Sequence, residues 1–125
     1  MQSIGIETWV RDTTQKACLP VDSQPELFSW YVKEFAKRDP DVQVAMSTLV
    51  NGANAAGFLP RVRVAVLGLY PSGGQITIDA QVEMRKDGLA NFEIHHLPTE
   101  YHLAQLLYPE EYSRFLDAFC SQHGM

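Results

Sequence analysis

Histidine and carboxylate side chains concentrate in one short segment, whose members are Glu93, His95, His96, Glu100 and His102. Side chains of these types bind zinc and act as general acids or bases. Successive residues of a strand point to opposite faces, so His95 and His96 on one strand cannot share a metal ion. We expect His96 to face the core and His95 to pair with Asp79 on the sheet surface. The segment therefore predicts no metal site and no bound cofactor.

The two cysteines do not form a recognisable catalytic arrangement. Cys18 lies in a loop with no histidine beside it in sequence, and Cys120 falls on the apolar stripe of a predicted helix, as a structural thiol would. The chain has no GxSxG, HExxH or CxxC motif and no nucleotide-binding glycine fingerprint. We therefore assign no catalytic residue, and we favour a binding protein over an enzyme.

The elements that would position these residues follow from hydrophobic periodicity. Alternating apolar residues predict a strand over 3–10, a possible short edge strand over 15–19, and a three-stranded antiparallel meander over 61–97. The register of that meander would place Val64 opposite Val82, and Arg63 opposite Glu83.

Helices are predicted on either side of the meander. Ser23 and Glu26 fit a capping box before an apolar stripe that ends near Arg38. Asp39 and Pro40 then fit the start of a second helix over 40–56. The alternative for this segment is a hairpin, because Asn51-Gly52 is a turn signal; the alanine content favours helix. Two further helical segments follow, one after Pro98 and one from Pro109.

This order of elements predicts an α+β fold. An antiparallel sheet with one polar face, made of the meander and the N-terminal strand, would carry helices on its other face as a two-layer sandwich. The length of 125 residues suits a single globular domain spanning 1–125.

Composition narrows the functional classes. The chain carries 10 Lys and Arg against 15 Asp and Glu, a net charge of -5, which argues against nucleic-acid binding because that requires clustered cations. No apolar run reaches the ~20 residues of a membrane span, and no signal peptide precedes the first elements. We expect a cytoplasmic protein without a membrane partner.

Two surfaces are candidates for binding. The open sheet face is predicted to carry a partner-binding patch of aromatic, apolar and charged residues: Trp9, Arg63, Leu67, Leu69, Asp79, Glu83 and His95. An aromatic pocket between helix and sheet is predicted from Tyr31, Phe35 and His96.

These surfaces suggest three functions. The preferred one is an interaction protein without catalysis (an adaptor, inhibitor or accessory subunit) that binds a protein partner or a second copy of itself. The alternatives are a small-molecule-binding protein or enzyme that uses the pocket, and a mobile-element inhibitor or immunity-type protein that blocks a basic surface.

Overall fold

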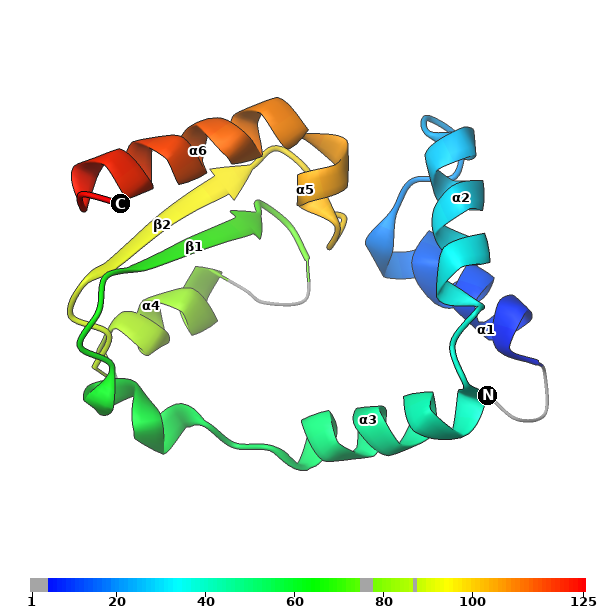
Figure 1. The fold of residues 1–125 in the computed structure, drawn as a ribbon, viewed down its shortest axis with the longest axis horizontal. Coiled ribbons are helices and arrows are strands. Elements are labelled where there is room, and N and C mark those ends of the chain that lie inside the picture. The colour runs from blue at the N-terminus through cyan, green and yellow to red at the C-terminus, as the bar shows by residue number, and fades with distance from the viewer. Residues whose placement is uncertain (1–4, 75–77, 87) are drawn as a thin grey trace. The chain divides into compact units, whose positions relative to one another are not determined.

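The computed structural model describes residues 5–74, 78–86 and 88–125. The chain divides into two compact units, Met1–Asn54 and Ala55–Met125, and each is described by itself (Figure 1). Among the described residues, no helix has both the length and the apolar content that crossing a bilayer would require.

The first unit is helical in its described part. It contains α1 (Ile6–Thr13), the π-helical turn η1 (Thr14–Cys18), α2 (Pro25–Phe35) and α3 (Pro40–Gly52). Helix α2 packs against α1 and η1. The residues buried between these elements are Val10, Thr14, Leu19, Phe28 and Val32.

The predicted N-terminal strands are wrong. Residues 6–10 of the segment 3–10 belong to α1, residues 1–4 lie outside the described part, and residues 15–18 of the predicted edge strand belong to η1. The alternating apolar residues gave the wrong prediction because Ile6 and Val10 are four positions apart, a spacing that also fits one face of a helix. Val10 is buried on that face.

Helices form on either side of position 39 as predicted, but they end earlier, at Phe35 instead of near Arg38 and at Gly52 instead of residue 56. Only one of the two predicted caps exists. The Asp39 carboxylate accepts hydrogen bonds from the backbone N–H groups of Asp41, at 2.9 Å, and Val42, at 3.2 Å. This cap and Pro40 start α3, so helix, rather than hairpin, is confirmed for this segment. Helix α2 instead has Gln24 at its N-cap and no side-chain cap, so the predicted capping box is wrong.

The second unit contains the only strands in the described part of the chain. Its elements are η2 (Ala56–Arg61), β1 (Val66–Pro71), α4 (Ile78–Lys86), β2 (Phe92–Leu97), α5 (Ala104–Leu107) and α6 (Pro109–Gln122). Strands β1 and β2 are parallel, with Val66 opposite Phe92 and Leu69 opposite His95. Parallel neighbours need a crossover connection, and α4 lies within it.

The predicted antiparallel meander is therefore wrong, and with it the antiparallel two-layer sandwich. Residues 78–84 of its middle strand are helical, residues 76 and 77 lie outside the described part, and the pairs Val64–Val82 and Arg63–Glu83 do not exist. The reason matches that for α1: Ile78 and Val82 satisfy both alternation and the four-residue spacing of a helix.

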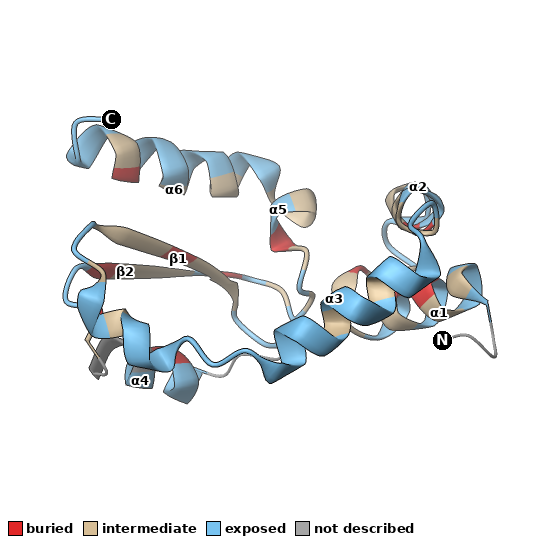
Figure 2. Cartoon of the chain, turned by 60° about the horizontal axis from the view of Figure 1, so that its bottom comes forward, coloured by how far each residue is buried: buried red, intermediate tan, exposed pale blue. Residues whose placement is uncertain are grey.

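Helices α6 and α4 lie on opposite sides of the two strands (Figures 1 and 2). On one side the Phe115 ring of α6 stacks on His95 with ring centroids 4.2 Å apart. On the other side, His96 Nε2–H donates to Oε1 of the buried Gln81 of α4 at 2.8 Å. Gly68 of β1 leaves room for two aromatic rings of the sheet, because a Cβ there would lie 2.6 Å from the ring of Tyr70 and 2.8 Å from that of Phe92.

Candidate functional site

Helix α3 makes side-chain hydrogen bonds through Gln43 and Ser47. Gln43 and Ser47 are half-buried and are the least exposed residues of the helix. The Nη1 group of Arg38 donates to Oε1 of Gln43 at 3.0 Å, and Nε2 of Gln43 donates to Ser47 Oγ at 3.3 Å. These bonds lie along one edge of the apolar side of α3, because Gln43 neighbours Met46 and Val50 on the helix surface. The other polar residues of the helix, Asp41, Thr48 and Asn51, are exposed.

The solvent-facing side of α3 carries what we call the outer stripe: Val42, Ala45, Met46, Leu49 and Val50. Their spacing of three and four positions places them along one side of the helix. The exposed fraction of the residue is 60% for Val42, 51% for Met46, 66% for Leu49 and 64% for Val50. No residue of α3 is buried, and Figure 2 shows the helix almost entirely in the exposed and intermediate colours. An apolar stripe of this kind on a surface marks a binding site more often than scattered exposed residues do.

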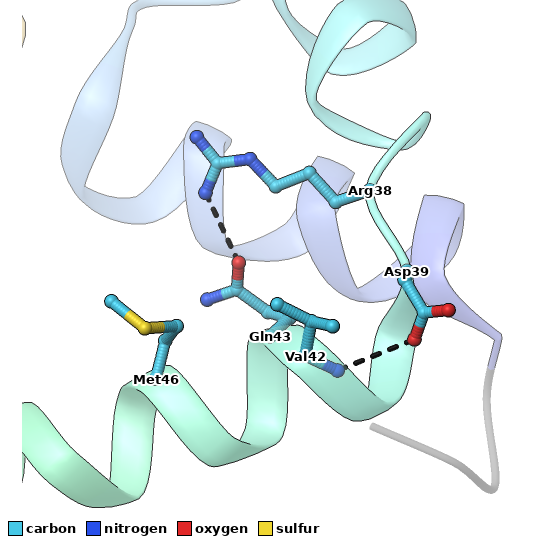
Figure 3. Close-up of a pocket in the computed structure, with 5 residues that line it drawn as sticks. All are labelled: Arg38, Asp39, Val42, Gln43 and Met46. Carbon is cyan, nitrogen blue, oxygen red and sulfur yellow. Dashed lines mark hydrogen bonds between the residues drawn. The ribbon is translucent and has the colours of Figure 1, made fainter.

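A pocket of about 380 Å³ opens at the N-terminal half of the outer stripe (Figure 3). Val42 and Met46 supply its apolar wall, and Arg38, Asp39 and Gln43 supply polar groups at its edge. The Asp39 carboxylate is already engaged by the backbone of α3, and Arg38 by Gln43. The pocket therefore offers mainly an apolar surface with its polar groups partly satisfied.

Arg38 connects the pocket to an aromatic pair of α2. Its guanidinium carbon lies 3.5 Å from the centre of the Phe35 ring, a cation–π contact, and the Tyr31 and Phe35 rings are 5.4 Å apart. Burial raises the pKa of Tyr31; the charge of Cys18 raises it further, and that of Arg38 opposes the shift. Burial also raises the pKa of the Cys18 thiol. A raised pKa lowers the thiolate fraction of Cys18, and the protonated thiol is a poor nucleophile.

The residues of the predicted aromatic pocket belong to different units. Tyr31 and Phe35 lie in the first unit, where their rings contact each other and the guanidinium of Arg38 lies over the Phe35 ring. His96 lies in the second unit and is exposed, so the expectation that it faces the core is wrong. Its ring is held by buried Gln81.

The residues of the predicted partner-binding patch do not share a sheet face. Trp9 lies on α1 of the first unit, and Asp79 and Glu83 lie on α4 rather than on a strand. Arg63 precedes β1, while Leu67, Leu69 and His95 lie on the sheet itself. The expected face is in part covered, because α6 stacks Phe115 on His95. The binding role of these residues stays a prediction.

The histidine and carboxylate segment forms a local pair rather than a centre. His95 Nε2–H donates to Glu93 Oε1 at 2.6 Å, in place of the predicted pairing with Asp79. Glu93 also lines a second hollow of about 280 Å³, between the strands and the end of α6, together with Phe119 and His123. Among residues 5–74, 78–86 and 88–125, no group of three or more His, Cys, Asp or Glu side chains is placed to hold a metal ion.

The outer stripe is not among the surfaces predicted from the sequence, because apolar spacing in a helix does not show whether that side is covered. One signal could have identified it. The segment 40–52 contains a single charged residue, Asp41, and a helix that is solvated on its polar side normally carries several.

Comparison of the chain with models of known protein families, with curated proteins and with solved structures gave no match.

Proposed function

We propose that this protein acts by binding another protein chain through the outer stripe of α3. The observation that carries the proposal is the exposure of the apolar side of this helix. Met46 and Leu49 are more than half exposed, and no residue of α3 is buried. A surface helix of a globular protein normally turns its apolar side to the core, because apolar side chains gain free energy on leaving water.

The energetics favour a covered helix. Burying an exposed Val, Leu or Met side chain contributes roughly 1.5–3 kcal/mol, so covering the outer stripe gains several kcal/mol in total. A helix of 13 residues is only marginally stable without tertiary packing, and no residue of α3 is buried. A partner that covers the stripe would therefore stabilise the helix as well as bind to it.

The form of the pocket supports a protein side chain rather than a free small molecule as its occupant. Small-molecule sites bury about 70–90% of their ligand in a concave cavity. Here the wall residue Val42 is 60% exposed and Met46 is 51% exposed, so the pocket is open along the stripe. An apolar side chain that protrudes from another helix would fit such an open recess. The chemistry expected is binding without catalysis, as for an adaptor, inhibitor or accessory subunit.

Photocross-linking in the producing cell tests this proposal. A photoreactive benzoyl-phenylalanine at position 49 should give a discrete cross-linked adduct, because this side chain lies on the outer stripe. The matched control carries the same group at Asn51, which is exposed on the opposite side of α3. Adducts formed at 49 but not at 51, and abolished by Met46→Glu, support the proposal. Equal labelling at both positions, or none at 49, shows that the stripe is not a binding surface.

A further inference from the structure

We propose that the outer edge of β2 is a second binding surface, which takes up an extended segment of a partner protein as a third strand of the sheet. The segment carries a basic residue beside Glu93 and an apolar residue beside Ile94. This edge lies in the second unit and α3 lies in the first, so the inference goes beyond the proposed function and does not rest on it.

Each strand of the sheet has one side without a strand partner. In the described part of the chain, β1 and β2 pair only with each other. The open edge of a strand presents a row of N–H and C=O groups, and the group that matches such a row is the backbone of another strand. A sheet of two strands is also smaller than the usual sheet of about four to six.

The hydrogen bonds between the strands show which backbone groups face outward. The N–H of Val66 donates to the carbonyl of Asn91 at 2.8 Å, and the N–H of Ser72 donates to that of Leu97 at 2.9 Å. Because a parallel strand directs alternate residues to one neighbour, β2 uses its odd-numbered residues toward β1. The even-numbered residues direct their backbone N–H and C=O groups away from β1: Phe92, Ile94 and His96.

The edge of β2 is better suited to strand addition than the edge of β1. By the same alternation, the outward positions of β1 are Leu67, Leu69 and Pro71. Pro71 has no backbone N–H, and proline protects strand edges from pairing for this reason. Residues 92–97 contain no proline, so each outward position of β2 keeps a donor as well as an acceptor.

The side chains of β2 indicate what the partner segment carries. Glu93 and His95 lie on the face of α6, and Ile94 lies on the opposite face, because successive residues of a strand alternate. The side chain of Glu93 is 38% exposed, and its Oε1 accepts from His95 at 2.6 Å, which leaves Oε2 for a basic side chain of the partner. A residue opposite Glu93 in an added strand places its Cβ about 5 Å away on the same face.

The surroundings of Glu93 favour a positive charge there. The hollow of about 280 Å³ beside Glu93 has no Lys or Arg and no other carboxylate in its lining. The C-terminal end of α6 contributes Gln122 and His123 to that lining, and this end of a helix dipole is negative. The whole chain has a net charge of -5, which also attracts a basic partner. On the other face, the half-buried Ile94 matches an apolar residue next in sequence to the basic one.

Hydrogen exchange with a basic peptide tests the edge. The probe is the acetylated peptide amide Ser-Thr-Val-Lys-Val-Thr-Ser, added to the full chain at concentrations up to about 1 mM. Exchange of the backbone N–H groups of Ile94 and His96 should slow by at least ~3-fold, because they gain acceptors. Exchange at Leu69, on the edge of β1, should not change. Absence of protection at Ile94, or equal protection at Leu69, overturns the proposal.

Methylation of single peptide nitrogens separates backbone pairing from side-chain contacts. Successive N–H groups of an extended peptide point to opposite sides, so only one of the lysine N–H and the following valine N–H faces β2. One of these two N-methylated peptides should therefore bind at least ~10-fold more weakly than the unmodified peptide, and the other within ~3-fold. Equal affinities of the two methylated peptides show that the peptide does not add as a strand.

Substitutions in the chain test the charge and the independence of the two surfaces. Glu93→Gln should weaken peptide binding by about 5-fold, and its effect should vanish when norleucine replaces the lysine of the peptide. Glu100→Gln, at an exposed carboxylate outside the strand, is the matched control and should have no effect. Met46→Glu on the outer stripe should also leave peptide binding unchanged. Loss of binding in Met46→Glu shows that the peptide binds α3, which overturns this inference and leaves the proposed function standing.

Discussion

Helices α3 and α6 have similar sequence patterns, but the apolar side is covered in α6 and exposed in α3. They are 13 and 14 residues long, each has proline in its first turn, and each carries apolar residues three and four positions apart. The stripe of α6 lies on the strands of its unit, where Phe115 stacks on His95 and Phe119 is buried. The stripe of α3 faces solvent, and no residue of that helix is buried.

The difference shows that an apolar stripe defines a surface to be covered without specifying what covers it. In α6 the covering element is a sheet formed by the same unit. In α3 no residue is buried, and Val42, Met46, Leu49 and Val50 are more than half exposed. The two helices also differ at their N-termini: α3 has the Asp39 side-chain cap, while α6 has none. We infer that α6 depends mainly on packing and α3 mainly on local capping.

The largest expected effect comes from truncating matched residues of the two stripes. Phe119→Ala should lower the free energy of unfolding by about 3–5 kcal/mol, because it empties a buried site against the sheet. Leu49→Ala should change it by less than about 0.5 kcal/mol, since this side chain is 66% exposed. Urea unfolding at a concentration that keeps the chain monomeric measures both. Comparable losses for the two variants would show that α3 is packed like α6.

A smaller effect is expected from the cap of α3. Asp39→Ala should destabilise the helix by about 1 kcal/mol, because the N–H groups of Asp41 and Val42 lose their acceptor. Hydrogen exchange at the first turn of α3 should therefore accelerate by about 5-fold. Asp39→Asn should retain most of the protection. If Asp39→Ala leaves exchange unchanged, α3 is held by packing rather than by its cap.

The smallest effect concerns the interior of the first unit. Because burial raises the pKa of Cys18, its thiol should react with iodoacetamide more slowly than the same thiol in the urea-unfolded chain, and its pH–rate midpoint should lie higher. The Cys120→Ser variant isolates this thiol.

The same shift has a consequence for stability. A thiol whose pKa is raised by folding stabilises the native state below the unfolded-state pKa, and this contribution is lost as the pH rises toward the folded-state value. Stability should therefore fall through that alkaline interval, and Cys18→Ala should reduce the fall. A pH–rate midpoint in the folded chain at or below that of the unfolded chain would contradict the burial of this thiol.

Sequence reasoning succeeded where a local signal decides the structure. Asp39-Pro40 and Pro109 mark the starts of α3 and α6, because proline at the first helical turn has a suitable φ and loses no hydrogen bond. It failed where one pattern fits two periods. Ile6 with Val10 and Ile78 with Val82 satisfy both a strand and a helix, so two predicted strands are helices. The single sheet face predicted for the partner-binding patch is wrong for the same reason, because it required Trp9 and Asp79 to lie on those two strands.

The amino-acid sequence by itself determined that α2, α3 and α6 form, where the last two begin, and which side of each is apolar, because capping, proline geometry and spacing act over a few residues. Tertiary structure alone decided that β1 pairs with β2 in parallel, with α4 inserted between them along the chain. It also decided that the stripe of α6 is covered while that of α3 is presented to solvent. Strand direction and burial depend on contacts between residues distant in sequence, and the periodicity within one segment carries no record of those contacts.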